Sequence, residues 1–333
     1  MERRHATGLA FGKFDPPHRG HSLLFDIALG HVDRLIVLVW DYPEQSVPAQ
    51  QRARWVREIV PEADVRVIPD DPHAASNDIA AQSEHVRRFL RGEAIDMLFT
   101  SEAYGEAFAR GIGAARHYNV DRDRAWVPVS GTTLRRAPLE HLEWLDPCVR
   151  AHYVKRVGIV GAESTGKTTL ARRLSAHYHT LWVPEYGRDY SLVKYEQGST
   201  GEFTSDEFFH IAREQQRHED EAARSANRLL ICDTDVLATK IWHERYLQAP
   251  APWLPVAPAR LALYLVPFPD TPYVQDEIRD AEHLRFWMYE RFLEEIAKLG
   301  IPHTVLQGSF DERFEQAIVA IDALMEAERS STD

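Results

Sequence analysis

The sequence feature that most constrains the fold is a glycine-rich loop at residues 161–169, which read Gly-Ala-Glu-Ser-Thr-Gly-Lys-Thr-Thr. The segment matches G-x-x-x-x-G-K-[ST] at every fixed position and lies between the apolar residues 157–160 and a helix-like stretch at 167–176. In that context the pattern binds phosphate, because backbone N–H groups and the positive end of the helix dipole face the anion. The loop therefore predicts a nucleotide site after a parallel strand.

Individual loop residues receive roles from the chemistry of phosphoryl transfer. Lys167 is expected to bridge the β- and γ-phosphates of ATP, and Thr168 is expected to ligate Mg²⁺. The other residues that we expect to bind ATP are Gly161, Glu163, Ser164, Thr165, Gly166 and Thr169.

Carboxylates follow two further apolar segments in this half of the chain. Residues 229–232 end in Asp233, Thr234 and Asp235, where a neighbouring strand would present carboxylates to the metal. Asp233 is the first candidate to organise Mg²⁺, whereas Asp235 either contacts the substrate or caps a helix. Glu185 follows another expected strand, and transfer to a hydroxyl needs a carboxylate that takes its proton. Either Glu185 or Asp233 could be this base.

Two arginines are candidates to cover the transferred phosphate. Arg188 lies in Val-Pro-Glu-Tyr-Gly-Arg-Asp at residues 183–189, and Arg279 lies in a charged stretch at 271–279. Arginine can neutralise the charge on a phosphoryl group during transfer. An arginine in a charged loop can equally be a solvated surface residue.

A histidine motif follows the first apolar segment of the chain. Residues 12–21 read Gly-Lys-Phe-Asp-Pro-Pro-His-Arg-Gly-His and open a helix-like stretch. His18 and His21 can direct imidazole N–H groups at phosphates that a helix N-terminus attracts. A metal site is the alternative, but no third ligand lies nearby at a zinc-like spacing.

A second anion-binding segment is expected at residues 129–135, which read Val-Ser-Gly-Thr-Thr-Leu-Arg. Ser130 is placed to cap a helix after an expected strand at 126–129, and Arg135 would add a cation to the exposed N–H groups. A capped helix without a ligand is the alternative for this segment.

The order of segments predicts an α/β fold with two doubly wound parallel-sheet domains. The strands expected in the first domain are 9–11, 35–40, 65–68, 97–99 and 126–129, with helices at 22–29 and 81–90. The strands expected in the second are 157–160, 229–232, 261–266 and 304–306, with closing helices at 283–299 and 312–327. The domains are placed at 1–150, including a helical connector from about 136, and at 151–333.

Composition limits the partners and the compartment. The net charge of -12 disfavours nonspecific binding to nucleic acid and to anionic membranes. The two cysteines, one in each half, favour a reducing compartment over a disulfide framework. Because we find no signal peptide and no apolar run of about 20 residues, we expect a cytoplasmic protein. A homo-oligomer is compatible with the sequence.

The two N-terminal segments together resemble the signature pair of the HxGH nucleotidyltransferase superfamily, G-x-F-x-P-x-H-x-G-H and I-S-x-T-x-x-R, with Val129 in place of Ile. An HxGH Rossmann-like domain followed by a P-loop kinase domain with Glu-Tyr-Gly-Arg-Asp and Asp-Thr-Asp resembles the bifunctional NadR family. That family joins nicotinamide mononucleotide (NMN) adenylyltransferase to ribosylnicotinamide kinase. The resemblance implies that the C-terminal domain phosphorylates nicotinamide riboside to NMN and that the N-terminal domain adenylylates NMN to NAD, both with ATP and Mg²⁺.

The resemblance also implies roles for individual residues. In the first site, those implied to bind ATP are Gly12, Lys13, Phe14, His18, His21, Ser130, Thr132 and Arg135. Of these, His18, His21 and Arg135 are also implied to be catalytic. Those implied to line its substrate pocket are Ser101 and Glu102. In the second site, the riboside would be held by Tyr186, Arg188, Asp235 and Arg279, and Lys167, Glu185 and Asp233 would be catalytic.

The chain departs from the family pattern at three places. The first strand begins near residue 8, so the helix-turn-helix DNA-binding domain of some members is not expected. Glu277 replaces a glycine in the lid-like stretch at 271–279. Residues 74–83 lack the tryptophans expected at an NMN pocket, for which Trp40, Trp55 or Trp126 could substitute unless they belong to the core.

Two other functions remain open at this point. The N-terminal domain could be weak or could adenylylate another phosphorylated acceptor, while the C-terminal domain remains a riboside kinase. Alternatively, the chain could sense NAD or ATP and regulate a partner protein.

Overall fold

The computed structural model describes residues 6–72, 74, 78–198, 202–252, 254, 261–272 and 282–330. The chain divides into two compact units, residues 1–150 and residues 151–333. No helix within the described ranges is long and apolar enough to cross a membrane.

The first unit is built on a five-stranded sheet with the strand order β3-β2-β1-β4-β5, in which every pairing is parallel. The strands are β1 (Thr7–Gly12), β2 (Arg34–Asp41), β3 (Asp64–Pro69), β4 (Met97–Thr100) and β5 (Arg116–Asn119). Residues 35–40 of β2 are all buried, as a parallel strand with helices on both faces requires.

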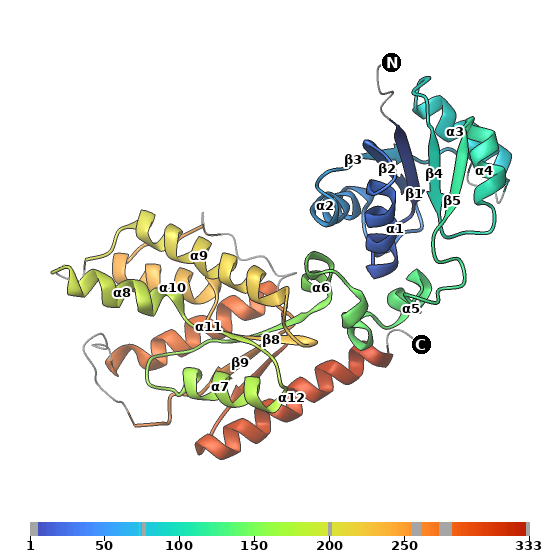
Figure 1. The fold of residues 1–333 in the computed structure, drawn as a ribbon. Helices are drawn as coiled ribbons and strands as arrows, with labels where there is room; N and C mark the ends of the chain where they lie inside the picture. The colour runs from blue at the N-terminus through green and yellow to red at the C-terminus, as the bar shows by residue number, and fades with distance from the viewer. Residues whose placement is uncertain are drawn as a thin grey trace. The chain divides into compact units, whose positions relative to one another are not determined.

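Helices cover both faces of this sheet (Figure 1). On one face lie α1 (Arg19–Leu29) and α2 (Ala49–Ile59), which contribute Phe25 and Val56 to the core. On the other lie α3 (Ile79–Phe89) and α4 (Gly105–Ile112), which contribute Val86 and Phe108. After β5 comes a helical connector of α5 (Gly131–Arg136), η1 (Pro138–Glu140), η2 (Leu142–Trp144) and α6 (Pro147–Tyr153), and the boundary between the units falls within α6.

The strand expected at 126–129 is wrong. These residues form no strand, and the fifth strand is β5, which sequence analysis missed because Arg-His-Tyr-Asn carries no apolar signature at the edge of a sheet. In the loop, the carboxylate of Asp121 accepts hydrogen bonds from the backbone N–H groups of Ala125 (2.7 Å), Trp126 (3.1 Å) and Val127 (3.0 Å). Backbone donors captured in this way are not available to a sheet.

The second unit repeats the architecture with the strand order β10-β9-β6-β8-β7, again entirely parallel. Its strands are β6 (Lys155–Ile159), β7 (Trp182–Val183), β8 (Leu229–Asp233), β9 (Leu263–Pro267) and β10 (His303–Leu306). The central strand β6 pairs Ile159 with Asp233 of β8, so the Asp233 carboxylate lies at the strand end from which the glycine loop departs.

Helices also cover both faces of the second sheet (Figure 1). On one face pack α7 (Lys167–His177) and α12 (Phe310–Ser330), and on the other α10 (Val236–Leu247) and α11 (Arg285–Leu299). The remaining long helices are α8 (Tyr186–Glu196) and α9 (Ser205–Ala223). Gly300 ends α11 at φ 68°, a left-handed conformation that favours glycine. The predicted fold class, two parallel-sheet α/β domains, is confirmed.

Candidate functional site

The N-terminal motif forms a helix cap made of two histidines. His18 is the N-cap of α1, and its Nδ1 accepts a hydrogen bond from the Gly20 N–H at 3.1 Å. The His21 Nδ1 accepts from the His18 N–H at 3.2 Å, and the two rings lie 3.9 Å apart. Since Nδ1 of each ring is an acceptor, a neutral ring carries its proton on Nε2. Each histidine can therefore offer an Nε2–H donor to a ligand.

Both histidines are held in the neutral form. Burial, together with the nearby charge of Arg124, lowers the pKa of His18 to about 4. Burial and the proximity of His18 and Arg124 also lower the pKa of His21 well below its usual value. The pair is therefore a fixed set of uncharged N–H donors at neutral pH.

Arginine side chains anchor the loop that carries the motif. Arg135, from α5, donates to the Asp15 carbonyl at 2.6 Å and to the Thr132 hydroxyl at 3.1 Å. The buried Arg52 donates to the carbonyl oxygens of Lys13, Val47 (2.8 Å) and Trp40 (3.1 Å). These bonds join the loop to α2 and α5, so the two motifs predicted from sequence lie in one site.

A cavity of about 560 Å³ opens at this site. The predicted residues that line it are Gly12, Lys13, Phe14, His18, His21, Ser101, Glu102 and Arg135. Ser130 and Thr132 are not among the lining residues. Ser130 caps α5 by accepting a hydrogen bond from the Thr133 N–H at 3.1 Å, and the Thr132 hydroxyl accepts one from Arg135. No cluster of three or more possible metal ligands of the His, Cys, Asp or Glu type occurs in the described part of the chain.

Sequence analysis missed several residues of this cavity. Arg124 lines it from the loop in which the Asp121 carboxylate accepts backbone hydrogen bonds. Sequence analysis expected a strand at 126–129, just after Arg124, and so gave no reason to place Arg124 in the cavity. Tyr42 also lines it, with its ring stacked at 5.1 Å and 14° on that of Trp40. Trp40, one of the candidates considered above, lines the cavity and is also a core residue at 2% exposed. Of the three tryptophans considered above, Trp55 is buried away from the cavity and Trp126 is 68% exposed.

The glycine loop of the second unit leads into α7 as predicted. Gly166 is its N-cap at φ 83°, a left-handed conformation that suits glycine. The Lys167 Nζ donates to the Ala162 carbonyl at 2.9 Å, and the Thr168 hydroxyl donates to the Asp233 carboxylate at 2.6 Å. The Thr168 hydroxyl and the Asp233 carboxylate therefore meet at the end of the central strands.

Asp233 is fitted to a cation. It is 1% exposed, and its Oδ1 has no hydrogen-bond partner among the described residues. Burial raises the pKa of its carboxyl, although Lys167 and the Thr168 hydroxyl oppose the shift. A buried, half-satisfied carboxylate beside a threonine hydroxyl is the donor set that Mg²⁺ takes in phosphate-loop enzymes.

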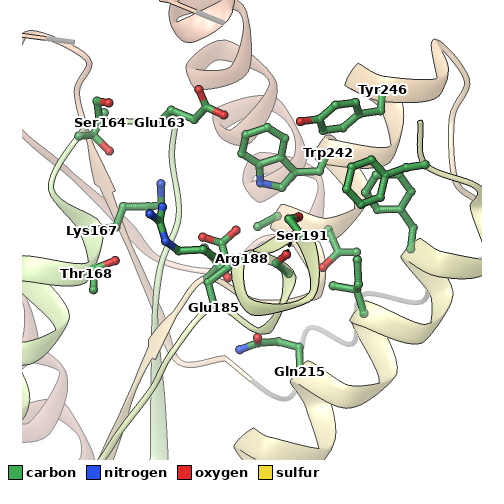
Figure 2. A pocket seen from close by; sticks show the side chains of 18 of the residues that line it. Glu163, Ser164, Lys167, Thr168, Glu185, Arg188, Ser191, Gln215, Trp242 and Tyr246 are labelled. Atoms are coloured by element: carbon green, nitrogen blue, oxygen red, sulfur yellow. Dashed lines mark hydrogen bonds between the residues drawn. The ribbon is translucent and has the colours of Figure 1, made fainter. Parts of the chain in front are cut away.

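Glu185 lines the neighbouring cavity, of about 180 Å³, from the start of α8. Burial raises the pKa of Glu185 to about 7; Lys167 and Arg188 oppose the shift, and Asp233 adds to it. Figure 2 shows Arg188 extending across the pocket toward Lys167. Of the two candidate bases, Glu185 lines the pocket, whereas Asp233 accepts a hydrogen bond from the Thr168 hydroxyl and is not among the lining residues.

The opposite wall of this pocket was not predicted. It comes from α9, α10 and the residues before α9, and its lining includes Phe203, Phe208, Ile211, Gln215, Trp242 and Tyr246. The buried Gln215 accepts from the Tyr186 N–H at 2.9 Å and so holds the turn that carries Glu185. Sequence offered only helical periodicity for these residues, which does not show which face meets a ligand.

Three predicted substrate contacts lie elsewhere or are not described. Asp235 caps α10 through the N–H groups of Leu237 (3.0 Å) and Ala238 (3.3 Å), and it receives the Tyr264 hydroxyl. That is the helix-cap alternative considered above. The Tyr186 hydroxyl lies 3.1 Å from His210 Nε2 and does not line the pocket. Arg279 and Glu277 lie outside the described residues, as does part of the 74–83 stretch.

Two family models match the chain, one in each unit. The model described as Cytidylyltransferase-like matches residues 9–137, and the model described as AAA domain matches residues 156–313. The trifunctional NAD biosynthesis/regulator protein NadR of Salmonella typhimurium (strain LT2) is 26% identical over 350 residues, covering 97% of this chain and 84% of that protein.

Solved structures of NadR share the fold over nearly the whole chain. A NadR structure in complex with NR has a TM-score of 0.76 at 23% identity, covering 96% of each chain. Another, in complex with NAD and AMP-PNP, has a TM-score of 0.72 at 22% identity, again covering 96% of each chain. The resemblance predicted from the sequence motifs is confirmed.

Proposed function

We propose that this NadR-like chain is a bifunctional enzyme of NAD salvage. Its C-terminal unit phosphorylates nicotinamide riboside to NMN, and its N-terminal unit adenylylates NMN to NAD, each with ATP. The observation that carries the proposal is that each unit contains its own cavity, in which a phosphate-binding helix N-terminus is joined by lysine or arginine. The similarity to NadR over 97% of the chain supports the pairing of the two reactions.

Adenylyl transfer suits the N-terminal cavity because the acceptor needs no base. A phosphate oxygen of NMN attacks the α-phosphorus of ATP, the bond to the β-phosphate oxygen breaks, and pyrophosphate leaves. The neutral N–H donors of His18 and His21 and the cations of Lys13 and Arg135 would stabilise the charge on the reacting phosphates. Of the carboxylates that line the cavity, Asp15 accepts a hydrogen bond from the Ser46 hydroxyl at 3.0 Å, and Asp121 accepts from backbone N–H groups of its own loop.

Phosphoryl transfer suits the C-terminal cavity because an alcohol acceptor must lose a proton. Glu185, with a pKa of about 7, can accept the proton of the riboside hydroxyl while that oxygen attacks the γ-phosphorus and ADP leaves. Lys167 and Arg188 would neutralise the phosphoryl oxygens. Among the two carboxylates, Glu185 is the proposed base because it faces the pocket.

Mg²⁺ is the implied cofactor of the second site. The Thr168 hydroxyl and the Asp233 carboxylate, with its unpartnered Oδ1, would hold it. When bound, Mg²⁺ would neutralise negative charge on the phosphates of ATP.

Product analysis tests the proposal directly. Purified protein is incubated with nicotinamide riboside, ATP and Mg²⁺, and NMN is resolved from NAD over time. We expect NMN to appear first and NAD to follow, and NMN supplied alone with ATP should also yield NAD. NMN without NAD would reassign the N-terminal unit to another acceptor, and the absence of both products would overturn the proposal.

A further inference from the structure

A buried ion pair joins the glycine loop of the C-terminal unit to the aromatic wall of its pocket. Arg245 Nη1 donates to Glu163 Oε1 at 3.2 Å, and the two side chains are 5% and 10% exposed. Glu163 belongs to the loop that wraps the phosphates, whereas Arg245 belongs to the last turn of α10. The pair therefore links two elements that lie more than 80 residues apart in sequence.

Arg245 also supports the aromatic rings of the wall. Its guanidinium lies over the Trp242 ring at 4.7 Å from the centroid and over the Tyr246 ring at 4.8 Å. The two rings themselves are stacked at 6.0 Å and 27°. Both rings line the pocket, while Arg245 lies behind them. Figure 2 shows the Glu163 side chain reaching from the loop toward the side of the pocket that carries Trp242 and Tyr246.

We propose that the Glu163–Arg245 ion pair positions the Trp242–Tyr246 wall against the phosphate loop and so couples nucleotide binding to riboside binding. The inference rests on the proposed function of this pocket. A buried pair is costly to desolvate and gives little net stability over an apolar replacement, so stability alone is a weak reason for it. Phosphates bound in the loop would hold Glu163, and through its ion pair they would hold Arg245 and the two rings against which Arg245 packs. By linkage, the riboside must strengthen nucleotide binding by the same factor.

Calorimetry on the full chain measures this coupling. The dissociation constant of nicotinamide riboside is determined with and without a saturating non-hydrolysable ATP analogue. We expect the analogue to tighten riboside binding by about tenfold, a typical coupling between two sites. Arg245→Met and Glu163→Gln should each reduce this ratio to near one, and the double variant should show no further loss. Arg245→Lys, which keeps the charge, should recover part of the ratio.

A matched control lies on the same helix. Lys240 of α10 pairs with the buried Glu295 at 2.6 Å but lines no part of the pocket. Lys240→Met should lower the melting temperature and leave the coupling ratio as in the wild type. If Arg245→Met lowers the melting temperature but keeps the wild-type ratio, or if the wild type itself shows a ratio of one, the coupling role is overturned. Failure of the wild type to bind riboside at all would instead overturn the proposed function on which it rests.

Discussion

The two units position a phosphate-binding helix in the same way but equip it differently. In both, the central strand of a parallel sheet runs into a loop and then into a helix N-terminus. The first helix is capped by two neutral histidines, whereas the second carries a lysine and faces a carboxylate with a pKa of about 7. The proposed acceptors would explain this difference, because a phosphate is already ionised and an alcohol is not.

The largest expected effect comes from replacing Lys167, which tests whether the two sites work independently. Lys167→Met removes the cation that would bridge the transferred phosphates, so the kcat/KM of riboside phosphorylation should fall by about 10³-fold. NMN adenylylation by the same preparation should keep its wild-type rate, because Lys167 does not line the N-terminal cavity. Steady-state assays of both reactions make the measurement. An equal fall in both rates would contradict the assignment of separate sites.

Glu185→Gln isolates the chemistry that only the second site needs. Loss of the base should lower the kcat of riboside phosphorylation by about 10²-fold. Because only ionised Glu185 can take a proton, the wild-type kcat/KM should fall as the pH drops below its pKa of about 7, and the variant should lose this limb. The pH profile of kcat/KM between 5 and 9 is the measurement. A variant that keeps the acidic limb would return the role of base to Asp233.

The adenylyl transfer profile provides the contrast. His18 becomes charged only near its pKa of about 4, so this reaction should show no histidine-dependent limb between pH 5 and 8. A limb near 6.5 that persists in His18→Asn would belong to the second ionisation of the NMN phosphate, at about 6. A limb that disappears in this variant would show that His18 titrates at its ordinary value and is not the neutral donor described above.

His18→Ala and His18→Asn separate the two roles of the first histidine. Both variants lack the Nε2–H donor and should lose about 10- to 100-fold in NMN adenylylation, the range for a hydrogen bond to a charged group. Only the alanine variant should also lose about 1 kcal/mol of unfolding free energy, because asparagine is a good N-cap. Kinetics and urea unfolding give the two values. Wild-type activity in His18→Asn would mean that His18 is a cap alone.

The same comparison shows how far sequence could go. Both loops were predictable because each motif is contiguous in sequence and the apolar pattern on either side of it predicts a strand and a helix. Asp233 was predictable for a similar reason, since a carboxylate at the end of a buried parallel strand must lie beside the neighbouring strand end. Local sequence therefore carries the part of each site that holds phosphates.

The cavity-lining residues outside the motifs were harder to predict. Gln215 and Trp242 come from different helices and meet in the pocket only through tertiary packing. Arg124 lies in a loop in which the Asp121 carboxylate accepts hydrogen bonds from several backbone N–H groups. The sequence of residues 126–129, taken alone, is typical of a strand and does not reveal this loop. Asp235 shows that closeness to a site residue in sequence is not enough, because this carboxylate lies two residues after Asp233 but caps α10.

The smallest expected effect concerns which tryptophan serves the NMN pocket. Trp40 lines the N-terminal cavity stacked on Tyr42, and its buried Nε1 has no hydrogen-bond partner among the described residues. Trp40→Phe keeps an aromatic ring but removes this N–H donor. Because a hydrogen bond contributes about 0.5–1.5 kcal/mol, the substitution should raise the KM for NMN by roughly two- to tenfold and leave the KM for ATP unchanged. Trp126→Ala is the control, since Trp126 is 68% exposed and should alter neither constant. A rise in the KM for ATP alone would assign Trp40 to the adenine of ATP. Tyr42 and its neighbours would then be the candidates to contact NMN.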